Sequence, residues 1–195
     1  MTDPAPTANG RLPAAVSITG LGLQLREWDD ADAPVMVELF DEPQVDRWTP
    51  LHHPFDPAAA RAYLEQARTR RAEGRSIQLA ITSDGHTALG EILLFVAGPD
   101  GPTQGGPYAE LAYAVGIRYR RQHLATRAVQ LMTDYAYQAL ALQQVILRIN
   151  PDNAASTAVA CATGFHLTNA APITRGRSGP LLTWRHQAPG VLRDA

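Results

Sequence analysis

Four arginines lie where a predicted strand, residues 109–115, runs through a short loop into a long helix. They are Arg118, Arg120, Arg121 and Arg127. The first N–H groups of a helix have no partners inside the helix and carry partial positive charge, so they attract anions. A diphosphate fits such a terminus, and nearby guanidinium groups add charge that binds it. The segment therefore predicts a site for a phosphate-bearing ligand.

Two glutamates on adjacent predicted strands are candidates for proton transfer. Glu110 lies at the start of the strand that enters the arginine-rich loop, and Glu91 lies on the strand before it. A carboxylate that faces a reacting ammonium can remove its proton directly or through water. Glu110 is the first candidate for such a general base and Glu91 the second, with a solvated strand residue as the alternative for Glu110. Strand alternation places Glu110 on the face of Ala112 and Ala114, opposite Tyr113.

The composition of the 195 residues excludes several kinds of chemistry. All 17 basic residues are arginine, so no lysine can form a Schiff base or hold the phosphates of a P-loop. The formal net charge of −2 argues against a protein built around nucleic acid. The single cysteine, Cys161, forms no disulfide framework or cysteine zinc cluster. His52 and His53 have no third ligand nearby in the sequence, and we expect no metal site.

The elements that must position these residues follow from apolar periodicity and from turn and capping residues. In the first half we expect a strand at 21–28 and a helix that follows three aspartates and ends near residue 40. After a proline-containing loop at 48–54, Asp56 and Pro57 start a second helix, which ends at Gly74. Strands at 76–82 and 87–96 follow around a turn, and a loop of glycines and prolines covers 97–107.

In the second half, apolar residues at spacings of three and four predict the long helix over 122–140. A strand at 145–149, a helix that Asn153 caps and that ends near Gly164, and strands at 165–168 and 181–186 complete the chain. The strand–helix–strand unit implies locally parallel strands, and the other pairs look antiparallel. The fold class is therefore α/β (α+β), with a mixed, mostly antiparallel central sheet and helices on both faces. We expect one domain, 16–187, between a flexible tail at 1–15 and a C-terminal tail at 188–195.

The arginine-rich segment resembles the signature of the GNAT acyltransferases, Q/R-x-x-G-x-G/A, at the entrance to their central helix. The matching residues are Arg120-Arg121-Gln122-His123-Leu124-Ala125, followed by Thr126. Residues 110–115 look like the strand that enters this loop in the ribosomal-protein N-terminal acetyltransferase branch. About thirty residues later, 147–156 and 162–165 match the family's second CoA segment. The resemblance covers residues 21–186.

This resemblance implies a sheet with a V-shaped splay, in which acetyl-CoA lies as the acyl donor without a metal. Backbone N–H groups near Val115 and Ile117 would polarise the thioester carbonyl, as an oxyanion hole does. Two positions depart from the family pattern: His123 replaces the usual glycine, and no tyrosine follows Phe165 to protonate the leaving thiolate. The CoA-binding residues that the resemblance implies are Val115, Ile117, Arg120, Arg121, Gln122, His123, Leu124, Ala125, Thr126, Asn153 and Ser156.

The function that the resemblance implies is direct transfer of an acetyl or other acyl group from acyl-CoA to a primary amine, on a small molecule or a protein N-terminus. Two alternatives stay open: the same fold with aminoacyl-tRNA as donor, and a CoA-binding regulatory module without turnover. We expect no other nucleic-acid partner. No apolar run is long enough to span a membrane and no secretory signal is visible, so we expect a cytoplasmic protein. The acceptor and a homodimer are open; segments 48–55 and 97–107 would shape the acceptor pocket.

Overall fold

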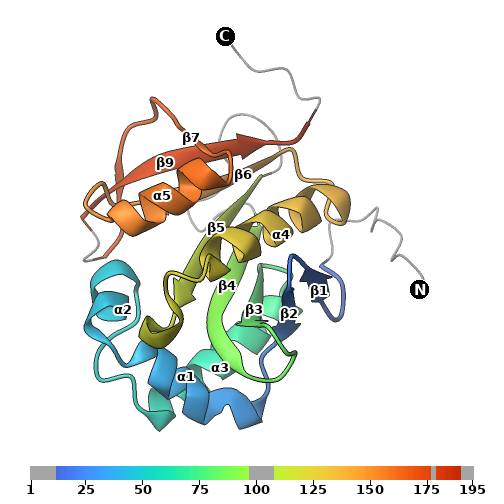
Figure 1. The fold of residues 1–195 in the computed structure, drawn as a ribbon, viewed down its shortest axis with the longest axis vertical. Coiled ribbons are helices and arrows are strands. Elements are labelled where there is room, and N and C mark those ends of the chain that lie inside the picture. The colour runs from blue at the N-terminus through green and yellow to red at the C-terminus, as the bar shows by residue number, and fades with distance from the viewer. Residues whose placement is uncertain (1–11, 97–107, 177–178, 190–195) are drawn as a thin grey trace.

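A computed structural model describes residues 12–96, 108–176 and 179–189, which one central sheet organises (Figure 1). The strand order is β1-β2-β3-β4-β5-β6-β9-β7, and β8 pairs with β9. Within the described residues, β5 and β6 form the one parallel pair and all other pairs are antiparallel. The strands are β1 (Ser17–Gly20), β2 (Leu23–Glu27), β3 (Ser76–Thr82), β4 (Ala88–Val96), β5 (Tyr108–Val115), β6 (Gln144–Ile149), β7 (His166–Leu167), β8 (Ile173–Thr174) and β9 (Pro180–Gln187).

Helices cover both faces of the sheet, which confirms the predicted fold class. α4 and α5 pack on one face, where Met132 and Ala160 join a core with Ile92 and Leu111. α1 and α3 pack on the other face, over the small residues of the central strands. The helices are α1 (Ala33–Phe40), α2 (Pro43–Trp48), α3 (Pro57–Ala72), α4 (Leu124–Gln138) and α5 (Ala154–Ala162), with short 3-10 turns η1 (Asp30–Asp32) and η2 (Ile117–Tyr119).

An aromatic cluster fixes the helices of the α1–α3 face against each other. The ring of Phe40, at the end of α1, lies 5.6 Å from that of Phe55 and 6.2 Å from that of Tyr63 on α3, centroid to centroid. Edge-to-face contacts of this kind stabilise a core beyond their buried area. Below them, Ala80 and Ala88 provide room because they are small and fully buried. The cluster therefore holds the chain between α1 and α3, including α2, in a defined position.

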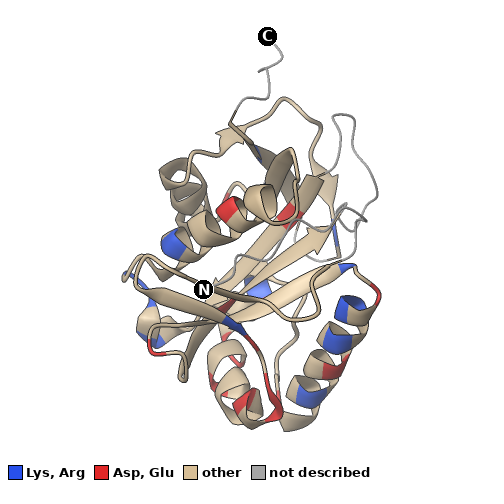
Figure 2. Ribbon diagram, turned by 90° about the vertical axis from the view of Figure 1, so that its right-hand side faces the viewer, with Lys and Arg blue, Asp and Glu red and all other residues tan. Residues whose placement is uncertain are grey.

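The capping residues predicted α3 well. The Asp56 side chain accepts a hydrogen bond from the N–H of Ala59, at 2.8 Å, and Pro57 occupies the first helical position. Gly74 follows the helix with φ +70°, which suits glycine. Figure 2 shows charged residues gathered along α3, whose outer face is solvated. Only Ala60 and Leu64 of this helix are buried.

Three boundaries differ from the sequence-based expectation. The predicted strand at 21–28 is the second half of a hairpin, because Leu21 and Gly22 turn the chain with positive φ after β1. α2 lies inside a stretch interpreted partly as a loop, since six residues are too few to show a helical period. The long helix begins at Leu124 and not at 122, because His123 is left-handed. The predicted loop 97–107 and parts of both tails lie outside the described residues.

Candidate active site

The two parallel strands at the centre of the sheet separate partway along their length. Residues 108–111 of β5 pair with 144–147 of β6, after which β5 continues to Val115 against β4 alone. A cavity of about 620 Å³ opens beside the separated end of β5. Its walls come from α2, the end of β5, the loop into α4, the first turn of α4, and α5. This is the V-shaped splay that the family resemblance implied, and the cavity is large enough to hold part of a cofactor-sized ligand.

Most of the predicted CoA-binding residues line this cavity. Ile117 and Gln122 do not; the side chain of Ile117 is 60 % exposed and Gln122 is also exposed. Trp48 and Thr49, from the segment 48–55 expected at the acceptor pocket, also line the cavity, together with Gln44 and Val45 of α2, which the sequence did not single out. The predicted residues that do line the cavity are Val115, Arg120, Arg121, His123, Leu124, Ala125, Thr126, Asn153 and Ser156.

The first turn of α4 presents unused N–H groups to the cavity. Leu124, Ala125 and Thr126 all line it, and the helix's hydrogen bonds begin with the N–H of Arg127, which donates to the His123 carbonyl at 3.0 Å. The His123 side chain makes no capping hydrogen bond. An uncapped helix start that faces a cavity is suited to binding an anion.

His123 occupies the glycine position of the motif in a backbone conformation that glycine prefers. Its φ is +55° and its ψ is +21°, in the left-handed region. Arg121, two residues earlier, also has a positive φ of 62°. A side chain in this region costs about 1–2 kcal/mol relative to glycine, since its Cβ crowds the following carbonyl. The loop therefore keeps the path that the family's glycine allows, at a cost in conformational strain.

Two of the four arginines hold the loop in place through side-chain hydrogen bonds. Arg120 donates to the Val115 carbonyl at 3.1 Å and to Gln44 at 2.7 Å, and it forms an ion pair with Glu42. Arg127 donates to the carbonyls of Leu21 and Gln122, at 2.9 and 3.1 Å. Their side chains tie the loop to α2 and to the β1–β2 hairpin.

The other two arginines are exposed. Arg121 lies at the cavity rim, and Arg118 lies in η2 outside the cavity lining. Four arginine charges were predicted around a diphosphate. Of these, Arg121 lies at the cavity and does not hold the loop in place. A phosphate at this site would depend on backbone N–H groups as well as on guanidinium groups.

Glu91 is a buried carboxyl on β4, next to the separated part of β5. It pairs in register with Ala114, which lines the cavity, and it is 3 % exposed. The Tyr63 hydroxyl donates to its Oε1 at 2.8 Å, and the Gln78 amide donates to its Oε2 at 3.0 Å. Burial raises the pKa of Glu91 to about 7, although these two hydrogen bonds and the charge of Arg70 lower it. A carboxyl with such a pKa exchanges protons near neutral pH.

Glu110 lies in the part of β5 that is still paired with β6, opposite Ile146. The Arg175 guanidinium donates to both of its carboxylate oxygens, at 2.5 and 2.8 Å. The Nε of Arg148 lies 3.9 Å from the same carboxylate. The side chains of Glu110 and Arg148 are 6 % and 9 % exposed. The carboxylate is thus held in a buried ion pair, away from the cavity lining.

Tyr113 and Ser156 bring hydroxyl groups to the cavity from two facing elements. Tyr113 of β5 and Ser156 of α5 both line the cavity, and the Tyr113 hydroxyl is 3.5 Å from the Ser156 carbonyl oxygen. Burial raises the pKa of Tyr113 to about 12. Asn153 accepts a hydrogen bond from the Ser156 N–H at 3.1 Å, so it caps α5 as the sequence predicted.

Neither metal clusters nor membrane helices are found in the described part of the chain. Within residues 12–96, 108–176 and 179–189, no three His, Cys, Asp or Glu side chains are grouped so that they could hold a metal ion. In the same ranges no helix is long and apolar enough to cross a bilayer.

A splayed sheet with an uncapped helix start at its opening defines a CoA-dependent acyltransferase, which transfers an acyl group from acyl-CoA to an amine. Residues 23–166 match the family model described as acetyltransferase (GNAT) domain, and the chain belongs to this family. It is therefore an N-acetyltransferase whose acyl donor is acetyl-CoA. These findings do not favour aminoacyl-tRNA as donor or a module without turnover.

Known proteins resemble the chain at low sequence identity. An uncharacterized N-acetyltransferase, p20 of Bacillus licheniformis, is 24 % identical over 135 residues, which are 69 % of this chain and 73 % of that protein. Mycobacterium smegmatis RimJ, solved with CoA-disulfide, has a TM-score of 0.70 at 20 % identity, over 92 % of this chain and 89 % of its own. The ribosomal-protein-S5-alanine acetyltransferase of Vibrio fischeri has a TM-score of 0.71 at 17 % identity, over 91 % and 100 %. The structural matches show the same fold.

Proposed function

We propose that this acetyltransferase acetylates the α-amine of a protein or peptide N-terminus, with Glu91 as the general base. The observation that carries the proposal is the buried carboxyl of Glu91, opposite Ala114, which lines the cavity in which the thioester would lie. Two structural relatives support a protein N-terminus as acceptor by their names, RimL, a ribosomal L7/L12 alpha-N-protein acetyltransferase, and the ribosomal-protein-S5-alanine acetyltransferase. We also propose that the enzyme works in the cytoplasm, where such acceptors are made.

The donor would enter along the splay. In this proposal the CoA diphosphate lies on the N–H groups of Leu124 to Thr126, and Arg121 adds charge at the rim. The pantetheine arm follows β5 toward Val115, between β5 and α5. The N–H of Gly116 donates to the Leu89 carbonyl at 3.0 Å and is not available to the thioester. The oxyanion contact would therefore come from the N–H of Val115, which lines the cavity, whereas Ile117 lies outside the lining.

Glu91 is the stronger candidate for the base because of its surroundings. It lies opposite Ala114, in the separated part of β5, whereas Glu110 lies four residues earlier and is held by Arg175. A base must also release its proton between turnovers, and a pKa near neutral suits both steps. Glu110 is the alternative base in this proposal. Ser156 and Tyr113 both line the cavity, and their hydroxyls are the candidates to protonate the leaving thiolate.

Comparison of two acyl donors tests the function. Acetyl-CoA and a phosphate-free acetyl-pantetheine carry the same thioester, and only the first can use the start of α4. We expect kcat/KM for acetyl-CoA to be at least about 10²-fold higher, since charge-assisted contacts with a diphosphate contribute about 3 kcal/mol or more. Peptides that begin with Ala or Ser should accept acetyl, and spermidine should serve as the control amine. Equal rates with both donors would contradict the CoA site, and activity on spermidine alone would contradict the acceptor.

A His123→Gly variant tests the fit of the loop. We expect the free energy of unfolding to rise by about 1 kcal/mol, because glycine relieves the left-handed strain at φ +55°. Acetyl-CoA should bind equally or more tightly, because the backbone can approach the phosphates more closely. Denaturant unfolding and calorimetry measure the two effects.

The control for this variant is Ala141→Gly. Ala141 is also left-handed, with φ 53°, and lies in the turn after α4. It should gain stability with no change in CoA affinity. A loss of acetyl-CoA affinity beyond about tenfold, roughly 1.4 kcal/mol, in His123→Gly would instead make the His123 side chain a ligand of the donor.

A further inference from the structure

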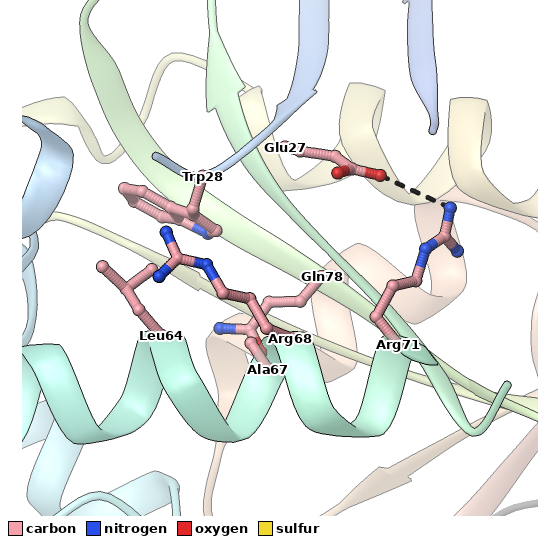
Figure 3. Close-up of a pocket in the computed structure, with 7 residues that line it drawn as sticks. All are labelled: Glu27, Trp28, Leu64, Ala67, Arg68, Arg71 and Gln78. Atoms are coloured by element: carbon pink, nitrogen blue, oxygen red, sulfur yellow. Dashed lines mark hydrogen bonds and ion pairs between the residues drawn. The ribbon is translucent and has the colours of Figure 1, made fainter. Parts of the chain in front are cut away.

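A second, small cavity lies on the α3 face of the sheet, apart from the splay. Its volume is about 60 Å³, and its walls come from the end of β2, from α3 and from β3. Figure 3 shows Trp28 above α3, Arg68 beneath the indole ring, and Glu27 joined to Arg71 at the other side. The cavity is lined by Glu27, Trp28, Leu64, Ala67, Arg68, Arg71 and Gln78.

Three buried polar atoms of this cavity's lining have no hydrogen-bond partner within the described residues. They are Nε1 of Trp28, Nη1 of Arg71 and Oε1 of Gln78. Two of these atoms are donors and one is an acceptor. Buried polar groups in folded proteins are almost always paired, with protein groups or with ordered water. Three such atoms around one cavity therefore point to a bound polar molecule.

Water matches both the chemistry and the volume of the cavity. One water can accept from the Trp28 N–H and donate to the Gln78 oxygen, whereas the Arg71 N–H lies across the cavity, beside Glu27, and needs a separate water. A cavity needs about 10–15 Å³ to hold one water, so 60 Å³ has room for several. An anion would satisfy the two donors but would repel the Gln78 oxygen, and Glu27 also carries negative charge at the wall.

Gln78 connects this cavity with Glu91. Its amide nitrogen donates to Oε2 of Glu91 at 3.0 Å, while its oxygen belongs to the unpaired set. The Gln78 oxygen and nitrogen belong to one amide. A group that binds the oxygen therefore also fixes the N–H group toward the Glu91 carboxylate. The opposite orientation would place two oxygens against each other.

We infer that this cavity is a hydration site whose water, held by Trp28, fixes the Gln78 amide with its N–H toward Glu91. Trp28 is then a positioning residue for the base, and it acts through water and Gln78 without touching substrate. The inference rests on the proposed role of Glu91 as the base. It assigns a catalytic consequence to a residue that lies across the cavity from Gln78.

Groups other than Gln78 also act on Glu91, and any change in its pKa must be compared with their contributions. Tyr63 donates to the carboxylate from α3, and Arg70 acts on it through its charge. α1 packs on this face through apolar residues such as Met36, and β5 contributes Ala114. The hydrogen bond from Gln78 lowers the pKa of Glu91, so weakening it must raise that pKa.

The first experiment detects the water directly. In ¹⁵N-labelled protein, the indole N–H of Trp28 is assigned by its loss in Trp28→Phe. We expect this proton to show a cross-relaxation peak with water of the sign given by long-lived, bound molecules. The indole N–H of Trp184 serves as the internal comparison. A Trp28 N–H signal without any bound-water peak would overturn the hydration site.

The second experiment tests the connection to Glu91. The Glu91 carboxyl is titrated by ¹³C NMR in substrate-free protein, and Trp28→Phe removes the indole N–H while it keeps a ring in place. We expect the pKa of Glu91 to rise by about 0.5 or more, and Gln78→Leu to raise it further. Trp184→Phe, the same chemical change on β9, should leave it unchanged.

The outcomes separate this inference from the proposed function. If Gln78→Leu moves the Glu91 titration and Trp28→Phe does not, the water link is wrong. If Trp28→Phe moves the titration but leaves the pH profile of kcat/KM in place, the link is right and Glu91 is not the base. An equal shift of the Glu91 titration and of the pH profile of kcat/KM supports both the water link and the role of Glu91 as the base.

Discussion

Glu91→Gln is expected to lower kcat for amine acetylation by about 10²-fold or more, with acetyl-CoA affinity nearly unchanged. Glutamine keeps the shape of the side chain but cannot take a proton from the acceptor ammonium. In the wild type, the carboxyl must be ionised to act, so kcat/KM should rise with pH through about 7 and level off above it. In the variant this rise of kcat/KM with pH should disappear. Rates of both proteins measured with one acceptor across pH separate the ionisation of Glu91 from that of the acceptor amine.

The same variant should be more stable than the wild type at alkaline pH. The pKa of Glu91 is about 7 in the folded protein against 4.5 for the ordinary group, so the folded state binds the proton more tightly. Its contribution to stability is complete below about 4.5 and is lost as pH rises through about 7. The pKa shift corresponds to about 3 kcal/mol of folding stability, which the variant keeps at alkaline pH because glutamine does not ionise. Unfolding at pH 5 and pH 8 measures the difference.

Glu65→Gln is the matched control for this substitution. Glu65 lies on α3, with a side chain 75 % exposed, and pairs only loosely with Arg68 at 4.0 Å. It should change neither the rate nor the pH dependence of stability. A Glu91→Gln variant as active as the wild type at every pH would exclude Glu91, and Glu110 would then take its place as the candidate base.

Glu110→Gln is expected to destabilise the fold by about 3–5 kcal/mol. Its carboxylate binds Arg175 and lies beside Arg148, which is 9 % exposed and donates to Thr183 at 2.5 Å. Glutamine leaves the charges of the two guanidinium groups uncompensated between β5, β6 and the chain after β8. Loss of one partner of a buried ion pair is costly because the remaining charge stays desolvated. Denaturant unfolding at neutral pH measures the effect.

Glu73→Gln provides the comparison with an exposed pair. Glu73 pairs with Arg75, and both side chains are about half exposed, so its loss should cost about 0–1 kcal/mol. The activity of folded Glu110→Gln distinguishes the two roles of this residue. A stable variant with a rate lowered about 10²-fold and a changed pH profile would make Glu110 the base, as the sequence alone suggested.

The sequence predicted the fold because each main element has a local signal. Asp56 and Pro57 started α3 where expected, and Asn153 capped α5. The sequence ranked Glu110 before Glu91 as the base, and it gave no information on how differently the two carboxyls are surrounded. Both lie on the same face of neighbouring strands, and one-dimensional alternation treats them alike. Arg175, which separates their environments, is 65 residues away from Glu110 along the chain.

The sequence by itself determined the family and the order of strand, arginine-rich loop and long helix. These properties depend on short stretches of chain, such as residues 120–126, whose backbone is fixed by local sterics and hydrogen bonds. Only the tertiary structure decided that Glu110 is bound by Arg175 whereas Glu91 is bound by Tyr63 and Gln78, that α2 lines the cavity, and that Trp28, Arg71 and Gln78 line one small cavity. Desolvation and pairing depend on every element packed around a group, and distances between those elements are set by the whole core.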